Sequence, residues 1–474
     1  MATPAVKSSG DLASTRGDSA TATVESLGYD GRGVARLDGK TVFIEGALAG
    51  ERVRFRYVSK HKNFDTGALI ELLEASPNRV TPPCPHFGTC GGCDLQHLRP
   101  EIQIQAKQRI LAEQFARIGK VQPETWLEPI AGPALGYRRR ARLGARLVPE
   151  RGGMQIGFRE RRKNFLANLD TCLVLEPKIA GLLPELRTLV GSLSCAHRIP
   201  QIEVASGDNF AGSEIGRASA RPEGGRARDG APHNASALVF RHLLPLVEHD
   251  EELLRDFGKR HDIQIYLQAH GPDSSVALWP DEPEELYYRL SEFNVEIRFR
   301  PTDFVQINST VNQKMVSQAV RLLELKGDEQ VLDLFCGLGN FTLPLARHAG
   351  RVLGVEADTT LIEGARRNAR LNEIANAEFM VANLYQEGGP VPWTDFRADR
   401  LLLDPPRGGA IEAIKRLIEP LPSRIVYVSC HPATLARDSE YLVHTLGYRL
   451  AAAGAMDMFP QTSHVESMAL FVRP

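Results

Sequence analysis

Several features that would place a chain in other protein classes are absent or scarce here. No apolar run approaches the roughly 18 residues of a transmembrane helix, so we expect no membrane association. Residues 1–20 lack the apolar segment of a secretory signal. Seven cysteines are too sparse for a disulfide scaffold, and their spacing indicates a reducing, cytoplasmic setting. The 57 basic and 58 acidic side chains nearly cancel, which excludes a histone-like polycation but not a local basic face.

The amino-terminal part of the chain reads as a tail followed by a small barrel. Residues 1–20 are rich in Ala, Ser, Thr, Gly and Asp, which is typical of a flexible tail. Over residues 21–80 the sequence predicts short strands, with Asp38-Gly39 as a hairpin turn. Period-two alternation puts three apolar residues on one face and three arginines on the other: Val53, Phe55 and Tyr57 against Arg52, Arg54 and Arg56. This pattern predicts an OB-like barrel with a basic wall, or alternatively an ordinary solvated strand face.

Residues 81–300 form a middle region that contains a strongly basic segment, although the net charge of the whole chain is only −1. Over 136–163 there are ten Lys and Arg against two Asp and Glu, a net charge of +8. Such a segment suits contacts to RNA phosphates. Residues 206–236 are rich in Gly, Ala, Arg and Ser without periodicity, and we interpret them as a mobile insertion.

From residue 301 to 474 the sequence alternates strand, loop and helix. The apolar runs 331–335, 351–355, 401–403 and 425–428 are typical of buried parallel strands. Helix-like stretches such as 361–372 lie between them. This alternation predicts a doubly wound α/β sheet.

The first of these strands leads into a glycine-containing turn, DLFCGLGNF at 333–341. Gly337 and Gly339 let the backbone turn sharply and approach a ligand, and Glu356 ends the next strand, where it could accept hydrogen bonds from a ribose. An ordinary strand–turn–helix could use the same glycines. The third glycine of the dinucleotide fingerprint is missing, which makes a dinucleotide the less favoured ligand.

Three further residues stand at strand ends in the same region. Asp404 opens a D-P-P-R-G segment, in which the two prolines make a rigid ledge. Cys430 precedes Pro432 at an expected helix start, where a thiol has a lowered pKa and could be a nucleophile, although a buried structural cysteine fits equally well. Glu466 stands before the final strand, as a general base or a plain strand-edge carboxylate.

Methylation of carbon 5 of uracil needs these groups together. A thiolate that adds to carbon 6 turns the ring into an enolate that is nucleophilic at carbon 5. After carbon 5 has taken a methyl group, a base must remove its proton so that the thiol can leave.

A separate group of cysteines lies in the middle region. Cys84, Cys90 and Cys93 are set among Pro and Gly, and Cys172 follows much later. Four thiolates could hold zinc or a [4Fe–4S] cluster, and zinc sites more often use two C-x2–4-C pairs. We interpret His86 and His97 as bystanders, and Cys195 and Cys336 as packed core thiols.

The combined motifs resemble the RNA uracil-C5 methyltransferases. The resemblance rests on Gln306, D-L-F-C-G-L-G-N-F, D-P-P-R-x-G at 404–409, S-C-H-P-x-T-L-x-R-D at 429–438 and H-V-E at 464–466. It implies a class I methyltransferase fold, with Cys430 as nucleophile and Glu466 as base. It also implies an S-adenosylmethionine site made of Gln306, Phe335, Asn340, Glu356, Asn383 and Asp404.

Features outside the carboxy-terminal region indicate which branch of the family the chain resembles. Residues 21–80 resemble a TRAM domain, and family members share the cysteine spacing as a [4Fe–4S] site, which implies Cys84, Cys90, Cys93 and Cys172 as ligands in a central α+β domain. Barrel and cluster together resemble the branch that modifies 23S ribosomal RNA, with no obligate protein partner. A transfer RNA uracil-C5 methyltransferase, or a non-catalytic RNA-binding assembly factor that keeps the fold, are the alternatives.

Overall fold

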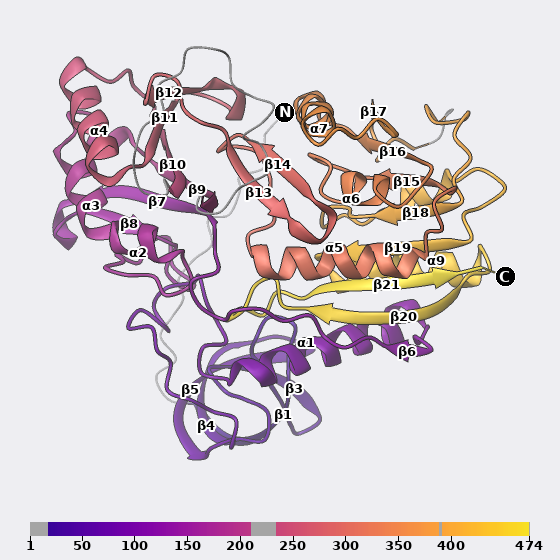
Figure 1. Cartoon of the computed structure of the whole chain (residues 1–474). Helices are drawn as coiled ribbons and strands as arrows, with labels where there is room; N and C mark the ends of the chain where they lie inside the picture. Colours follow the sequence, from indigo (N-terminus) through magenta and orange to yellow (C-terminus); the bar gives the residue numbers. More distant parts are fainter. Residues whose placement is uncertain (1–17, 210–233, 388–390, 474) are drawn as a thin grey trace, which may run out of the picture. The chain divides into compact units, whose positions relative to one another are not determined.

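The computed structural model of the chain describes residues 18–209, 234–387 and 391–473 (Figure 1). They form two compact units. The first holds the chain up to Thr81 together with His97–Arg99, and the second holds Pro82–Gln96 and Pro100–Pro474. Nearly all of the predicted tail 1–20 and most of the predicted insertion 206–236 lie outside the described residues. Within the described ranges, no helix has the length and apolar character needed to cross a membrane.

The first unit contains the predicted barrel. Its five strands close in the order β1-β2-β3-β5-β4. Their bounds are β1 Ser19–Leu27, β2 Gly33–Leu37, β3 Lys40–Glu45, β4 Arg52–Lys60 and β5 Phe64–Glu74. Asp38 and Gly39 both have positive φ, 50° and 77°, as a two-residue turn between β2 and β3 requires.

Strand β4 has the two faces that its sequence predicts. Val53 and Phe55 are fully buried in the barrel, while Arg52 and Arg54 point to solvent. Both arginines form ion pairs with glutamates of β5, at 3.3 and 2.8 Å. The basic wall is therefore partly neutralised by the neighbouring strand.

The second unit contains a six-stranded sheet in the order β12-β11-β10-β9-β7-β8. Its strands are β7 Arg140–Val148, β8 Gly153–Gly157, β9 Gln201–Asn209, β10 Asn234–Arg241, β11 Gln264–Gln268 and β12 Ser275–Trp279. Three helices accompany them, α2 Pro177–Gly181, α3 Leu183–Ser192 and α4 Glu248–His261. Residues 206–209 and 234–236 are strand residues, with Ser206 opposite Ser236, so the ends of the predicted insertion belong to this sheet.

The same unit contains an eight-stranded sheet in the order β17-β16-β15-β18-β19-β21-β20-β6. Its strands are β6 Thr125–Trp126, β15 Gln330–Leu334, β16 Arg351–Glu356, β17 Ala377–Val381, β18 Arg400–Leu403, β19 Arg424–Ser429, β20 Arg449–Met456 and β21 Glu466–Val472. The helices of this region are α5 Ser309–Leu323, α6 Thr342–Ala346, α7 Thr359–Leu371, α8 Ile411–Lys415 and α9 Pro432–His444. The apolar runs predicted as parallel strands are β15, β16, β18 and β19, which are buried on both faces.

The expected boundary near residue 300 is not a division between compact units. The second unit is continuous across it. Helix α1 (Pro100–Gln114) packs on α9 and β20, and β6 extends the eight-stranded sheet beside β20. The hairpin of β13 (Leu286–Leu290) and β14 (Val295–Phe299) shares its hydrophobic core with α5 and β15. The expected central region therefore contributes elements to the carboxy-terminal sheet.

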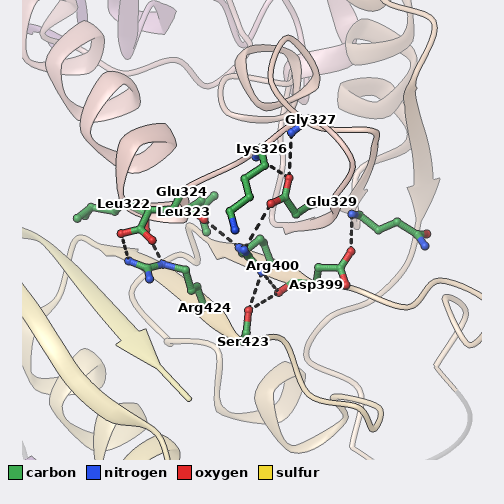
Figure 2. A network of polar contacts seen from close by, with 11 residues as sticks. Leu322, Leu323, Glu324, Lys326, Gly327, Glu329, Asp399, Arg400, Ser423 and Arg424 are labelled. Atoms are coloured by element: carbon green, nitrogen blue, oxygen red, sulfur yellow. Dashed lines mark hydrogen bonds and ion pairs between the residues drawn. The ribbon is translucent and has the colours of Figure 1, made fainter. Parts of the chain in front are cut away.

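A polar network fastens the amino ends of β18 and β19 (Figure 2). Arg400 donates from Nε to the Leu323 carbonyl at 2.9 Å and from Nη1 to Ser423 Oγ at 2.6 Å. Its other terminal nitrogen faces Glu329, 3.5 Å away. Arg424 donates to the Leu322 carbonyl at 3.0 Å. These contacts tie the end of α5 to the sheet at the edge opposite the carboxyl ends of the parallel strands.

Candidate active site

A cavity of about 490 Å³ lies at the carboxyl ends of β15, β16, β18 and β19. Parallel strands end at one edge of a sheet, so residues far apart in the sequence meet there. Seven residues singled out from the sequence line the cavity: Gln306, Phe335, Asn340, Glu356, Asp404, Cys430 and Glu466. The fold thus brings the predicted donor site and the predicted reaction centre into one space.

The turn after β15 forms the floor of this cavity. Phe335, Gly337 and Gly339 have φ values of 67°, 54° and 93°, a conformation that costs little only at glycine. The backbone N–H of Gly337 points at Glu356, whose Oε2 lies 3.4 Å away. Glu356 also accepts from the N–H of Ala357 at 2.6 Å. The carboxylate is therefore fixed at the end of β16 by backbone groups.

Asn340 is held by two neighbours that the sequence did not single out. Tyr288 Oη donates to Asn340 Oδ1 at 2.9 Å. Asn312 and Asn340 exchange two amide hydrogen bonds, each 3.0 Å long. These contacts leave the Asn340 side chain little freedom to rotate.

Asn383 is placed differently from the other predicted donor-site residues. Its side chain is exposed, and its Oδ1 accepts from the N–H of Tyr385 at 3.0 Å. Leu384 and Tyr385 line the cavity beside it. Tyr385 also packs against Phe335, with ring centroids 5.7 Å apart.

Cys430 and Glu466 meet through the register of two strands. Ser429 of β19 lies opposite Ser467 of β21 in an antiparallel pair. Cys430 directly follows Ser429, and Glu466 directly precedes Ser467, so the two residues lie at the same end of this strand pair. Residues separated by 36 positions in the sequence therefore both line the cavity.

The expected lowering of the Cys430 pKa is wrong. Burial, together with Glu466 and Asp404, raises the pKa of Cys430 to about 12, against a smaller lowering by Arg407. The expectation considered only the start of α9, whereas desolvation and two carboxyl groups act on the thiol more strongly.

The carboxyl groups of Glu466 and Asp404 are shifted as well. Burial and the nearby Asp404 raise the pKa of Glu466, Lys107 and Arg407 lower it, and the result is a pKa of about 8. Burial alone raises the pKa of Asp404 to about 7. Clustered groups with perturbed pKa values in a cavity are typical of an active site.

Other residues of the cavity wall had no predicted role, although Arg407 and His464 belong to two of the quoted motifs. Arg407, which follows the two prolines, is exposed and lies with Nη2 3.3 Å from His464 Nδ1. Phe304 and Tyr385 are aromatic residues that are 70% and 45% exposed while lining the cavity. Only the fold reveals that these two exposed aromatic side chains border the same space as Cys430 and Glu466.

Known proteins are similar to this chain in sequence and in fold. A family model described as tRNA (Uracil-5-)-methyltransferase matches residues 238–473, and a TRAM domain model matches residues 13–56. A 23S rRNA (uracil(1939)-C(5))-methyltransferase RlmD of Acidithiobacillus ferrooxidans is 48% identical, covering 95% of this chain and 96% of its own. Its namesake in Alcanivorax borkumensis is 47% identical, with coverages of 95% and 96%. The chain belongs to this family of RNA uracil-C5 methyltransferases.

A solved structure supports the fold of this uracil methyltransferase. Pyrococcus abyssi tRNA (uracil-54, C5)-methyltransferase, in complex with S-adenosyl-L-homocysteine, matches with a TM-score of 0.68. The match covers 96% of this chain and 100% of the other at 24% sequence identity, so it concerns the fold. The predicted multidomain α/β architecture, with a TRAM barrel and a carboxy-terminal methyltransferase sheet, is confirmed.

The four cysteines predicted as cluster ligands line a second, small cavity of the methyltransferase, and all four are free thiols: Cys84, Cys90, Cys93 and Cys172. Burial raises the pKa of Cys93 to about 12, and the nearby cysteines add to the rise. The N–H of Gly92 approaches Cys90 Sγ at 3.4 Å. No three His, Cys, Asp or Glu side chains of the described ranges are arranged to hold a metal ion.

The basic segment 136–163 of the methyltransferase has less unpaired positive charge than its sequence suggests. Glu203 pairs with Arg142 at 3.1 Å and with Arg140 at 3.5 Å. Glu160, within the segment, pairs with Arg151 at 2.7 Å and with Lys163 at 3.3 Å. Glu203 of the neighbouring strand β9 and Glu160 of the segment itself therefore neutralise part of the predicted positive patch, while Arg146 and Arg159 remain exposed.

Proposed function

We propose that this chain methylates carbon 5 of a uridine in 23S ribosomal RNA, with Cys430 as the nucleophile and Glu466 as the general base. The observation that carries the proposal is the pairing of Ser429 in β19 with Ser467 in β21, next to which Cys430 and Glu466 line the same cavity as Gly337 of the glycine turn. The target is supported by the names of relatives nearly half identical to this chain along almost its whole length.

We assign the methyl-donor site to six residues that surround the glycine turn. They are Gln306, Phe335, Asn340, Glu356, Asn383 and Asp404. Glu356 and Asn340 offer polar groups that the protein has already oriented, and Phe335 offers an aromatic face. S-adenosylmethionine bound there would supply a methyl group on a positively charged sulfur. The contacts of Asn383 favour a role through Tyr385, whose position it fixes.

In the proposed reaction, the thiol of Cys430 loses its proton and its sulfur bonds to carbon 6 of uracil, which moves electrons into an enolate. Carbon 5 would then take the methyl group as the bond between the methyl carbon and the donor's sulfur breaks, and the sulfur would keep the electron pair and become neutral. Glu466 removes the proton from carbon 5, and the bond between sulfur and carbon 6 breaks as the ring double bond returns. Glu466 must be ionised for this last step, and the nearby charges of Lys107 and Arg407 favour that state.

Replacing the nucleophile tests the proposal. We expect Cys430→Ala to abolish formation of 5-methyluridine in 23S RNA while RNA affinity stays within about twofold, because the thiol is needed for bond formation only. The measurement is transfer of labelled methyl groups to 23S RNA and, separately, to transfer RNA.

Cys195→Ala is the matched control, because Cys195 is a buried thiol in a different part of the second unit. Turnover by Cys430→Ala would refute the nucleophile. Methylation of transfer RNA alone would replace the ribosomal target, and a wild-type chain inactive on both RNAs would favour an assembly factor.

We further propose that Cys84, Cys90, Cys93 and Cys172 hold a [4Fe–4S] cluster that orders the surrounding loop. Each ligand of such a cluster binds a different iron, so the thiols need not converge on one point. A small cavity lined by all four thiols, with a backbone N–H directed at one of them, suits negatively charged sulfur. This assignment and the spacing of the cysteines favour the reducing, cytoplasmic setting.

Metal analysis tests the cluster. We expect protein purified without oxygen to be brown and to contain about four iron and four sulfide per chain. Cys172→Ala should lower both, whereas Cys195→Ala should not. Colourless protein with one zinc per chain would contradict the assignment.

A further inference from the structure

The segment that joins β20 to β21 forms part of the cavity wall. It runs from residue 457 to residue 465 and leads directly into Glu466. Phe459 and His464, both in this connection, line the cavity. We call it the β20–β21 connection. Sheet pairing holds Glu466 opposite Met456 of β20 and holds the residues that follow it in β21. The residues that lead into Glu466 are held by the contacts of the connection.

The loop that carries the first three cysteines holds the connection from one side. The N–H groups of Asp94 and Leu95 both donate to the carbonyl of Gln461, each at 3.0 Å. Ser463 Oγ donates to Asp94 Oδ2 at 2.9 Å. Asp94 directly follows Cys93 in the sequence. One residue step therefore separates the cysteine site from the connection.

Helix α1 holds the connection from a second direction. Gln103, which is fully buried, donates to Gln461 Oε1 at 3.0 Å and accepts from the Gln461 N–H at 2.9 Å. The same amide donates to the carbonyl of Leu95 at 3.0 Å, which joins all three segments. Lys107, also buried, donates to Asp457 Oδ1 at 2.6 Å and to the carbonyl of Phe459 at 3.0 Å.

The backbone conformation of Gln461 also indicates that contacts with other segments hold the β20–β21 connection in place. Its φ is 69°, in the left-handed region that a side chain other than glycine seldom adopts. Such a conformation persists where surrounding contacts fix it, and here backbone and side chain of Gln461 are both bonded.

We propose that Asp94 and Gln103 are positioning residues for the general base: through Gln461 and Ser463 they fix the β20–β21 connection and thereby the carboxyl group of Glu466. The cysteine loop thus takes part in the reaction by orienting one catalytic group. This inference rests on the proposed function, because it assigns a role in the last step of that reaction.

The inference makes a prediction specific to one step. Addition of Cys430 to carbon 6 and methylation of carbon 5 do not use Glu466, whereas release of the product does. A misplaced base therefore slows release, and the covalent protein–RNA adduct accumulates. In RNA with 5-fluorouridine, carbon 5 has no proton to lose, so the adduct forms and stays whatever the position of Glu466.

The test uses Asp94→Ala, Ser463→Ala and the double variant, with Glu101→Ala as a control on an exposed position of α1. We expect turnover to fall about tenfold to a hundredfold in each variant. We also expect more denaturation-stable adduct with unmodified RNA, and adduct formation with 5-fluorouridine RNA within about twofold of wild type. The double variant should resemble the singles, since both remove one contact.

Asp94→Asn provides the rescue, because its amide oxygen still accepts from Ser463, and it should turn over nearly as wild type. Ser463→Ala should keep the iron content of the wild type, since it lies outside the cysteine loop. Unchanged turnover in Ser463→Ala would overturn the inference, as would a parallel loss of turnover and of both adducts. A wild-type chain that forms no adduct with 5-fluorouridine RNA would instead refute the proposed function.

Discussion

At the scale of single residues, the carboxyl group of Glu466 stands among charges of both signs. Burial and Asp404 raise its pKa, and Lys107 and Arg407 lower it, with a result of about 8. Cys430 and His464 also face this part of the cavity. A base with a pKa near the working pH combines a useful ionised fraction with a strong pull on a proton.

The pH dependence of the reaction follows from this balance. Glu466 acts only when ionised, and the proposed reaction uses it in the last step, the release of the product. We therefore expect kcat to rise with pH through an apparent pKa of about 8. Removing the negative neighbour with Asp404→Asn should move this rise to lower pH, and removing the positive neighbour with Arg407→Gln should move it to higher pH. The measurement is kcat for a 23S RNA fragment at saturating concentration between about pH 6 and 9.

The two substitutions lie in the same cavity and remove charges of opposite sign, so each serves as the control for the other. Shifts of this rise in the same direction for both variants would contradict the electrostatic account. A rise of the rate near the ordinary pKa of a glutamate would show that burial does not raise the pKa of Glu466.

At the scale of elements, the methyltransferase sheet is fastened at the edge away from its active site. Arg400 opens β18 and donates to α5, to Ser423 and toward Glu329. Its side chain is only 14% exposed, and that of Glu329 only 8%. If Arg400 is removed, its buried partners keep polar groups without a hydrogen bond. Such unsatisfied groups lower the free energy of unfolding by more than the ion pair itself contributes to it.

We therefore expect Arg400→Met to lower the free energy of unfolding by about 1–3 kcal/mol. Affinity for S-adenosylhomocysteine should stay unchanged, because the network lies at the opposite edge of the sheet. Denaturant unfolding and calorimetric binding measure the two quantities.

Arg351→Met is the control, since Arg351 opens β16 in the same sheet and pairs with Glu378 in an exposed position, where a pair contributes less than about 1 kcal/mol. Equal losses of stability in the two variants would contradict the prediction, because they would show that burial does not increase the contribution of the Arg400 network to the free energy of unfolding.

At the scale of the whole molecule, local patterns predicted the parts whose neighbours lie close in the sequence. The Asp38-Gly39 turn, the two faces of β4 and the four apolar parallel strands each depend on short-range periodicity or backbone freedom. The expected meeting of Cys430 and Glu466 needed the family resemblance, because strand register across β19 and β21 leaves no local mark.

What the sequence could not predict depends on distant packing. Strand β6 has two residues, both exposed, so no periodicity announces that it extends the carboxy-terminal sheet. Gln103 and Lys107 are polar residues on the buried side of α1, and their partners Gln461 and Asp457 lie 358 and 350 positions away in the sequence. The direction of the Cys430 pKa shift likewise depended on burial and on carboxyl groups from other strands.

The path of the chain between the two compact units has a practical consequence. After Thr81 the chain leaves the first unit for the cysteine loop, and then His97–Arg99 return to it, where Val80 donates to the carbonyl of His97 at 3.0 Å and Arg99 to that of Asn78 at 3.0 Å. The first unit, which contains the barrel, is thus built from two separate stretches of the chain. Swapping it between related enzymes would require both stretches to be transplanted together, so recombination that exchanges the amino-terminal 80 or so residues alone should yield poorly joined chimaeras.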